Sequence, residues 1–115
     1  MLYLAVVPVT PLMPPIGVDA TVLSEIAVLV SWTESVSVSP TDESVYTVRY
    51  GQRTLRGRYR YVNVTKATAT LDQLRPHTEY EISVRVSRGS RHSTWSMSVL
   101  VVTKQAGMSV VRPMY

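Results

Sequence analysis

LDQLRPHTEYEISVRV, residues 71–86, is the stretch that says most about the fold. Leu74 is expected to fill the bottom of a core, and Pro76 stiffens the turn that follows it. Tyr80 then stands where a tyrosine corner places a buried ring, whose hydroxyl bonds to the backbone a few residues upstream. From Tyr80 to Val86 every second residue is apolar, as in a strand with one buried face. The stretch therefore predicts a corner between two strands.

Alternation of apolar and polar residues recurs on both sides of this corner, and Trp32 lies in the second such segment. No window holds a convincing 3.6-residue apolar period, so helix is not expected beyond a turn. Cysteine is absent, which excludes disulfides and thiolate metal sites. The sequence predicts an all-β, seven-stranded antiparallel Greek-key β-sandwich. The expected strands are residues 18–22, 28–32, 46–50, 58–61, 67–71, 80–86 and 95–103.

The 115-residue chain has the length of one domain, which is expected to span residues 14–104. Residues 1–13 contain an apolar run that is too short to cross a bilayer and lacks a basic start. They are expected to be a linker, an upstream piece or a leader, and residues 105–115 are expected to be a second linker. No transmembrane segment is recognised, so any membrane attachment is expected to lie outside this sequence.

Four segments together resemble a fibronectin type III domain. They are PPIGVDATVLSEIAVLVSW (14–32), VYTVRY (45–50), LDQLRPHTEYEISVRV (71–86) and STWSMSVLVVT (93–103). PPIGV and STWSM look most like the repeats of the DCC/neogenin class of immunoglobulin-superfamily receptors, protogenin-like members included. This resemblance implies an immunoglobulin-like module in the extracellular part of a plasma-membrane receptor for cell adhesion, axon guidance or developmental signalling. Its implied partners are a protein ligand, by analogy of netrin or repulsive-guidance type, or neighbouring domains of the same receptor.

Two other functions stay open at this point. The domain would be a purely structural fibronectin type III spacer if it had no ligand of its own. STWS, residues 93–96, also resembles half of the Trp-Ser repeat of cytokine-receptor modules. The absence of cysteine and of the second half of the repeat weakens that alternative.

Catalysis is not expected, and neither a cofactor nor a metal is expected. His77 and His92, the only histidines, are expected in exposed loops and lack the spacing of a metal site. There is no nucleophile elbow and no phosphate-binding glycine loop. Residues 88–90 resemble an integrin-binding Arg-Gly-Asp loop without its carboxylate, and Gly89 is expected to supply a positive φ in a hairpin.

Asn63 begins an Asn-Val-Thr sequon, and its glycosylation is expected in the extracellular setting that the resemblance implies. Alternation is expected to turn Tyr59 and Tyr61 toward the core. Asn63 would then also face inward, so a bend or a strand end is expected near Val62.

Positive charge is concentrated in RYGQRTLRGRYRYVNVT, residues 49–65. Residues 49–66 hold six Lys or Arg and no acid, whereas residues 1–48 hold five acids and no base. Alternation predicts one basic sheet face. Its expected members are Arg49, Arg58, Arg60, Arg85 and Trp95, with Trp95 either stacked on Arg49 and Arg85 or merely covering the rim of the sandwich.

Such a face suits an anionic partner because guanidinium groups bind sulfate, phosphate and carboxylate through paired hydrogen bonds. Outside the cell, the partner would be heparan sulfate or an acidic protein patch. The alternative is a solvated face whose arginines pair with acids such as Glu81. Nucleic acid is not expected, because neither an aromatic stacking platform nor a groove-binding helix is predicted.

Overall fold

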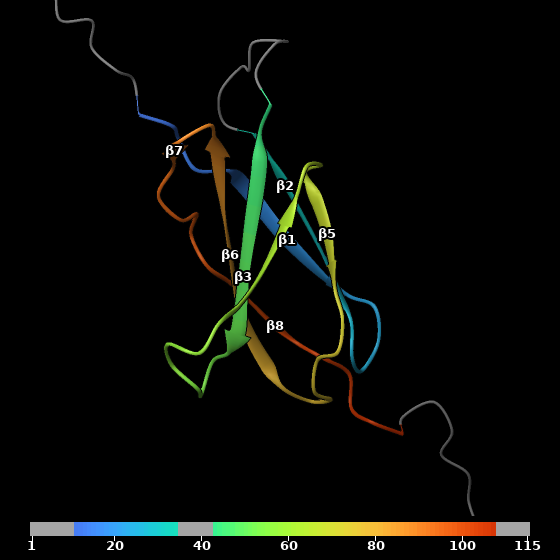
Figure 1. The fold of residues 1–115 in the computed structure, drawn as a ribbon. Helices are drawn as coiled ribbons and strands as arrows, with labels where there is room; N and C mark the ends of the chain where they lie inside the picture. The colour runs from blue at the N-terminus through green and yellow to red at the C-terminus, as the bar shows by residue number, and fades with distance from the viewer. Residues whose placement is uncertain (1–10, 35–42, 108–115) are drawn as a thin grey trace, which may run out of the picture.

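The computed structural model describes residues 11–34 and 43–107, which form two antiparallel sheets (Figure 1). The three-stranded sheet has the order β1-β2-β5 and contains β1 (Ile16–Val22), β2 (Val28–Thr33) and β5 (Thr68–Leu71). The five-stranded sheet has the order β4-β3-β6-β7, with β8 also paired with β6. Its strands are β3 (Val45–Gln52), β4 (Arg60–Val64), β6 (Glu79–Arg88), β7 (Arg91–His92) and β8 (Val99–Val102). The predicted all-β sandwich is confirmed.

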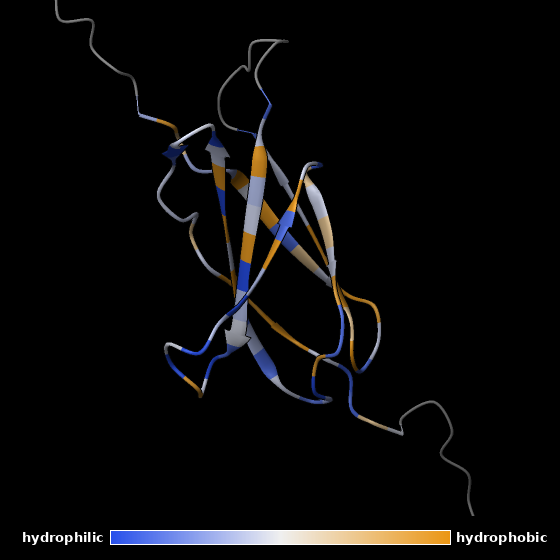
Figure 2. Cartoon of the chain, viewed as in Figure 1, coloured by the Kyte–Doolittle hydropathy of each residue, from blue (hydrophilic) through white to orange (hydrophobic). Residues whose placement is uncertain are grey.

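The core lies between the two sheets, where every second residue of a strand turns inward. Banding along β6 in Figure 2 shows this alternation of apolar and polar residues. The ring of Trp32 meets that of Tyr46 edge-on, with centroids 5.3 Å apart. The buried apolar residues are Val28, Val30, Trp32, Tyr46, Val48, Tyr50, Ala69, Leu71, Leu74, Tyr80, Ile82, Val84 and Val86. Removal of these side chains from water stabilises the sandwich.

The β5–β6 connection is the predicted tyrosine corner. Tyr80 is 3% exposed, and its hydroxyl oxygen accepts a hydrogen bond of 2.8 Å from the backbone N–H of Arg75. Leu74 is buried, and its N–H donates to the carbonyl of Ile26, which ties the corner to the β1–β2 hairpin. Pro76 lies half-buried in the turn between Leu74 and Tyr80. The motif thus fastens both sheets together at one end.

The predicted seventh strand, residues 95–103, is shorter in the structure: within this range only β8 (Val99–Val102) is a strand, and the two-residue β7 precedes it. β7 and β8 both pair with β6, and the chain between them follows β6 through Ser93 and Ser96. The N–H groups of Val86 and Val84 donate to the hydroxyls of Ser93 and Ser96, at 3.0 and 2.9 Å. Side-chain oxygens therefore replace backbone carbonyls. Their three-residue spacing matches polyproline II rather than the two-residue period of a pleated strand.

The predicted orientation of β4 is wrong. Tyr50 pairs with Arg60, and Val48 pairs with Val62, so Arg60, Val62 and Val64 share the face that adjoins the core. Tyr61 points outward and is 60% exposed. The strand also continues through Val64 instead of ending near Val62. Val62 and Val64 therefore pack beside the core, and the strand takes the orientation that buries these valines rather than the one that would bury Tyr59 and Tyr61.

Figure 1 places the β3–β4 turn and the β5–β6 corner at one end of the sandwich and the β6–β7 turn at the other. At the corner end, the N–H of His77 donates to the carbonyl of Lys104. In the β6–β7 turn, Gly89 has a φ of 60°, as predicted for this hairpin. None of the described residues belongs to a helix long and apolar enough to cross a membrane.

Candidate functional site

The outer face of the five-stranded sheet carries alternating rings and guanidinium groups, in the order Tyr59, Arg49, Trp95, Arg85. The Cζ atom of Arg49 lies 4.7 Å from the centroid of the Tyr59 ring and 4.4 Å from that of Trp95. The Cζ atom of Arg85 lies 4.9 Å from the Trp95 centroid. Of the two expectations for Trp95, stacking on Arg49 and Arg85 is the one that the structure shows. We call these four residues the outer-face stack.

Strand register explains why the two arginines meet Trp95. Arg49 pairs with Ser83 on β6, and Arg85 pairs with Thr47 on β3, so both guanidinium groups leave the same face of the pleat. The Nε of Arg49 donates to the hydroxyl of Ser83 at 2.9 Å. The Nε of Arg85 is buried and has no hydrogen-bond acceptor among the described residues. A buried donor without an acceptor destabilises the fold, and stacking on Trp95 partly offsets this, by about 0.5–1 kcal/mol or more for each desolvated cation–π contact.

Tyr61 borders the outer-face stack, with its ring centroid 6.3 Å from that of Trp95. Its place on the outer face, and that of Tyr59 in the stack, were missed because alternation assigned both tyrosines to the core. The signal that opposed this assignment was the pair Val62 and Val64, which supply an equally regular apolar phase. Tyr61 is the most exposed aromatic side chain among the described residues that the outer face presents.

Asn63 lies on the outer face of β4 and is exposed. It pairs with Thr47, whose hydroxyl donates to the Oδ1 atom of Asn63 at 2.8 Å. A pocket of about 430 Å³ adjoins Asn63 and is also lined by Tyr61 and Arg85. The sequon therefore stands beside the outer-face stack, on an edge strand open to solvent.

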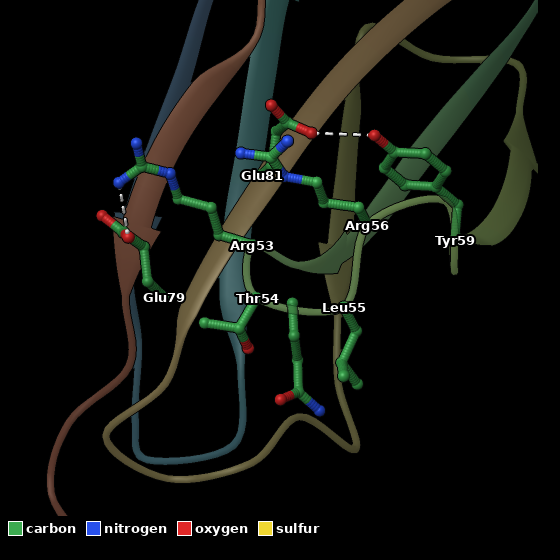
Figure 3. Close-up of a pocket in the computed structure, with 8 residues that line it drawn as sticks. Arg53, Thr54, Leu55, Arg56, Tyr59, Glu79 and Glu81 are labelled. Atoms are coloured by element: carbon green, nitrogen blue, oxygen red, sulfur yellow. Dashed lines mark hydrogen bonds and ion pairs between the residues drawn. The ribbon is translucent and has the colours of Figure 1, made fainter.

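One side of the β3–β4 turn forms a pocket of about 660 Å³ in which bases and acids are mixed (Figure 3). Arg53 forms an ion pair with Glu79, with 3.1 Å between Nη1 and Oε1. The hydroxyl of Tyr59 donates to Oε1 of Glu81 at 2.8 Å, and this hydrogen bond raises the pKa of Tyr59. The chain around the turn lacks acids in sequence, but β6 supplies them in space.

The other side of the β3–β4 turn forms a smaller pocket, of about 260 Å³, lined by Arg58, Arg60 and Arg75 and by no acid. Arg60 extends over the ring of Tyr50, with Cζ 4.8 Å from the centroid. Its Nη2 donates to the carbonyl of Gln73 at 3.3 Å.

The prediction of one basic face is therefore wrong. Arg58 lies in the turn, before β4 begins, and Arg60 lies on the core-side face of β4. Neither belongs to the outer-face stack, which contains Arg49 and Arg85. Arg75, which no expectation included, joins Arg58 and Arg60 from the β5–β6 corner. No local pattern signals this meeting, because it depends on how the two sheets pack.

At the opposite end, Glu34 collects three hydrogen bonds on its Oε1 atom. Tyr46 donates at 2.8 Å, Ser44 at 3.3 Å and the Nη2 of Arg88 at 3.1 Å. Burial and the hydrogen bond to Glu34 raise the pKa of Tyr46 to about 12. The charge of Arg88 is therefore matched by Glu34.

Metal and acid-base groups do not gather in the part of the chain that the structure describes. Within residues 11–34 and 43–107, no three His, Cys, Asp or Glu side chains could hold a metal ion together. His77 lies in the β5–β6 corner and His92 in β7, both are exposed, and Figure 1 shows these two elements at opposite ends of the sandwich. His92 shares a hydrogen bond of 2.6 Å with the hydroxyl of Ser87.

Comparison with known proteins gives a family match over most of the chain. The model of the fibronectin type III domain matches residues 13–102. Neogenin of Rattus norvegicus is 38% identical over 93 residues, which cover 77% of this chain and 7% of neogenin. The netrin receptor DCC of Homo sapiens is 36% identical over 101 residues, which cover 84% of this chain and 7% of DCC. The chain thus corresponds to a small part of each curated relative.

Solved structures share the fold. The FN1–FN3 domains of chicken CNTN1 match with a TM-score of 0.72 and 24% identity, over 83% of this chain and 33% of that chain. A myokine structure matches with a TM-score of 0.70 and 21% identity, over 84% of this chain and 100% of that chain. At these identities, the likeness concerns the arrangement of strands alone.

Proposed function

The chain belongs to the fibronectin type III family, and from this premise we propose that it is a non-catalytic binding module in the extracellular part of a cell-surface receptor. Its similarity to neogenin and to the netrin receptor DCC supports this proposal. The corresponding cellular role is cell adhesion, axon guidance or developmental signalling. The sandwich presents a partner surface on a rigid frame, which fibronectin type III architecture suits because strands and corners hold its outer residues in register.

The outer-face stack, with Tyr61 at its border, is the proposed contact surface for a protein ligand. The observation that carries this proposal is the alternation of two guanidinium groups with aromatic rings beside an exposed tyrosine. Tryptophan, tyrosine and arginine are the residues that most often dominate binding energy at protein interfaces. Because Arg49 and Arg85 are already ordered by stacking, their immobilisation on binding costs less side-chain entropy.

The proposed ligand is a netrin, because the chain is similar to the netrin receptor DCC. We would measure binding of the 115-residue chain to a netrin by surface plasmon resonance. Tyr61→Ser should weaken binding about tenfold, the effect of losing a moderate aromatic anchor. Leu29→Ser is the matched control, because Leu29 is 36% exposed on the opposite sheet. It should leave binding unchanged.

Each outcome decides one part of the proposal. Strong binding that Tyr61→Ser leaves unchanged would reject the outer face as the contact surface. No binding by the unmodified chain would reject the netrin-type ligand and favour a purely structural spacer. A folded Tyr61→Ser variant is expected, because this side chain is outside the core.

Asn63 is the proposed site of N-linked glycosylation. Its exposure on edge strand β4 supports access of the transferase, and Thr65 completes the sequon in an exposed turn. Expression in a secretory host should give a mass increase that glycosidase removes and that Asn63→Gln abolishes. A glycan at this position would restrict approach to the outer-face stack from the β4 side. An unchanged mass in the unmodified chain would contradict the assignment.

Residues 14–104 are the proposed folding unit, with linkers at 1–13 and 105–115. The family match over residues 13–102 and the strands between Ile16 and Val102 support these boundaries. A chain trimmed to residues 14–104 should therefore melt at the temperature of the full chain. A lower melting temperature would show that a flanking segment contributes to the fold.

A further inference from the structure

We propose that Arg58, Arg60 and Arg75 form a second binding site, for a sulfate group of an extracellular glycosaminoglycan. The site lies at the end of the sandwich, between the β3–β4 turn and the β5–β6 corner (Figure 1). It depends on the extracellular placement proposed above for its biological ligand. It does not depend on the outer-face stack, because the two sites share no residue.

The site brings three arginines together from three parts of the chain. Arg58 comes from the turn, Arg60 from the start of β4 and Arg75 from the corner. The pocket of about 260 Å³ contains no carboxylate in its lining. Its other lining residues are Tyr50, Gly51, Gln52, Leu55, Gln73 and Tyr80. Three arginines therefore line one small pocket that no carboxylate lines.

Separate contacts of the fold hold Arg58 and Arg60 in place. A Cβ atom on Gly51 would lie 2.3 Å from the carbonyl oxygen of Arg58, so glycine permits the turn to close against β3. The N–H of Arg58 also donates to the carbonyl of Leu55 at 3.1 Å. Arg60 is held over Tyr50 and bonded to the carbonyl of Gln73. These two arginines are thus positioned before a ligand arrives.

Arg75 is positioned by the tyrosine corner. Its backbone N–H donates to the hydroxyl of Tyr80, which is buried in the core and cannot move with the surface. The side chain of Arg75 is exposed and stays available to a ligand. The tyrosine corner therefore also fixes the backbone of Arg75, one of the three arginines of the site. Preorganisation of this kind lowers the entropic cost of binding.

Sulfate suits this arrangement because its oxygens accept paired hydrogen bonds from planar guanidinium groups. The pocket is smaller than the roughly 300–1,000 Å³ of a typical small-molecule site. It therefore fits one sulfate group, while the rest of the glycosaminoglycan chain continues across the surface of the domain. The opposite side of the same turn does not offer this chemistry, since Glu79 pairs with Arg53 and Glu81 lines that pocket.

An acidic protein segment is the less favoured ligand. Interfaces between proteins usually have an accessible aromatic or apolar anchor at their centre. Tyr50 and Tyr80, the rings that line this pocket, are 8% and 3% exposed and are committed to the core. Leu55, 43% exposed, is the one apolar side chain of the lining that is accessible, and no aromatic ring of the lining is; the remaining accessible groups are guanidinium, amide and backbone, which a sulfated sugar chain can use.

The test is salt elution from heparin and from a cation exchanger, with two variants of equal charge. Arg58→Ser/Arg60→Ser removes two positive charges from the end of the β3–β4 turn and the start of β4, and Arg53→Ser/Arg56→Ser removes two from the turn itself. On heparin, the first pair should elute at clearly lower salt than the second. On the cation exchanger, the two should elute together, because that matrix reads only net charge. Arg75→Ser alone should reproduce part of the heparin shift without touching the turn.

Three results would overturn the proposal. The first is equal displacement of both double variants on heparin. The second is equal retention of the unmodified chain on heparin and on desulfated heparin, which keeps its carboxylates but has lost its sulfate groups. The third is competition by poly-glutamate as strong as that by heparin, which would favour an acidic protein ligand. Tyr61→Ser should not change heparin elution, so failure of the outer-face proposal and failure of this one give different results.

Discussion

Replacement of Tyr80 by phenylalanine removes a single oxygen from the tyrosine corner and leaves the buried ring in place. The lost group accepts the 2.8 Å hydrogen bond from the N–H of Arg75, and no cavity forms in the core. A hydrogen bond contributes about 0.5–1.5 kcal/mol net, and a donor left without a partner costs about 1–3 kcal/mol when buried. Arg75 itself is exposed, so water can reach part of that N–H. We therefore expect a loss of about 1–1.5 kcal/mol.

The measurement is urea unfolding followed by tryptophan fluorescence, with thermal melts in parallel. For a domain of this size, about 1 kcal/mol corresponds to about 4–8 °C in melting temperature. The matched control is Tyr61→Phe, because Tyr61 is 60% exposed and its hydroxyl bonds to no other described residue. The control should stay within about 0.5 kcal/mol of the unmodified chain.

Equal stability of the two variants would refute the reasoning. It would mean that the hydroxyl of Tyr80 contributes no more than a solvated one, and that the ring alone holds the corner. A loss confined to Tyr80→Phe with an unchanged denaturant slope would support it, because the slope reports the surface exposed on unfolding.

Three further predictions concern other contacts. Gly51→Ala should lower the unfolding free energy by about 1–3 kcal/mol, since its Cβ would meet the backbone of Arg58; a loss under about 0.5 kcal/mol in urea would contradict this. The pKa of Tyr46 is raised to about 12, so its stabilising effect should be complete below pH 10 and lost between pH 10 and 12. The stability difference between the unmodified chain and Tyr46→Phe should shrink over that range, and a constant difference would count against the shift. A double-mutant cycle of Trp95→Ala with Arg85→Ala should give a coupling of about 0.5–1 kcal/mol, whereas additive losses would exclude a stacking contribution.

The corner was predictable because its determinants are local. Tyr80 and its hydrogen-bond partner Arg75 are five residues apart, and Leu74 lies in the same short connection between β5 and β6. Nothing elsewhere in the chain needs to be known to place this motif. Trp32 and the alternating valines likewise identify their own buried face.

The orientation of β4 was not predictable because two apolar phases compete within it. Tyr59 and Tyr61 favour one face, and Val62 and Val64 favour the other. Pairing of Val48 with Val62 decides between them, and this register is not visible locally because residues 51–59 separate the paired Tyr50 and Arg60. Trp95, in the segment between β7 and β8, then contacts the outward ring of Tyr61.

The charge pattern misled for a related reason. Residues 49–66 contain no acid, yet Glu79 and Glu81 come from β6 to one side of the turn. Arg75 comes from the corner to its other side. The sequence shows a dense group of arginines. It does not show that Arg49 and Arg85 stack on Trp95, that acids neutralise the pocket of Arg53, and that the other pocket is lined by no acid. This arrangement depends on strands that are distant in sequence.

The hydroxyl-bonded segment between β7 and β8 also bears on aggregation. A long, regular strand at the edge of a valine-rich sheet would offer unpaired backbone groups to another chain. Here the edge has a two-residue strand, a serine-bonded interruption and a four-residue strand, so it offers no continuous template for intermolecular pairing. Ser93 and Ser96 thus protect the folded domain against sheet extension while they hold Trp95 in place.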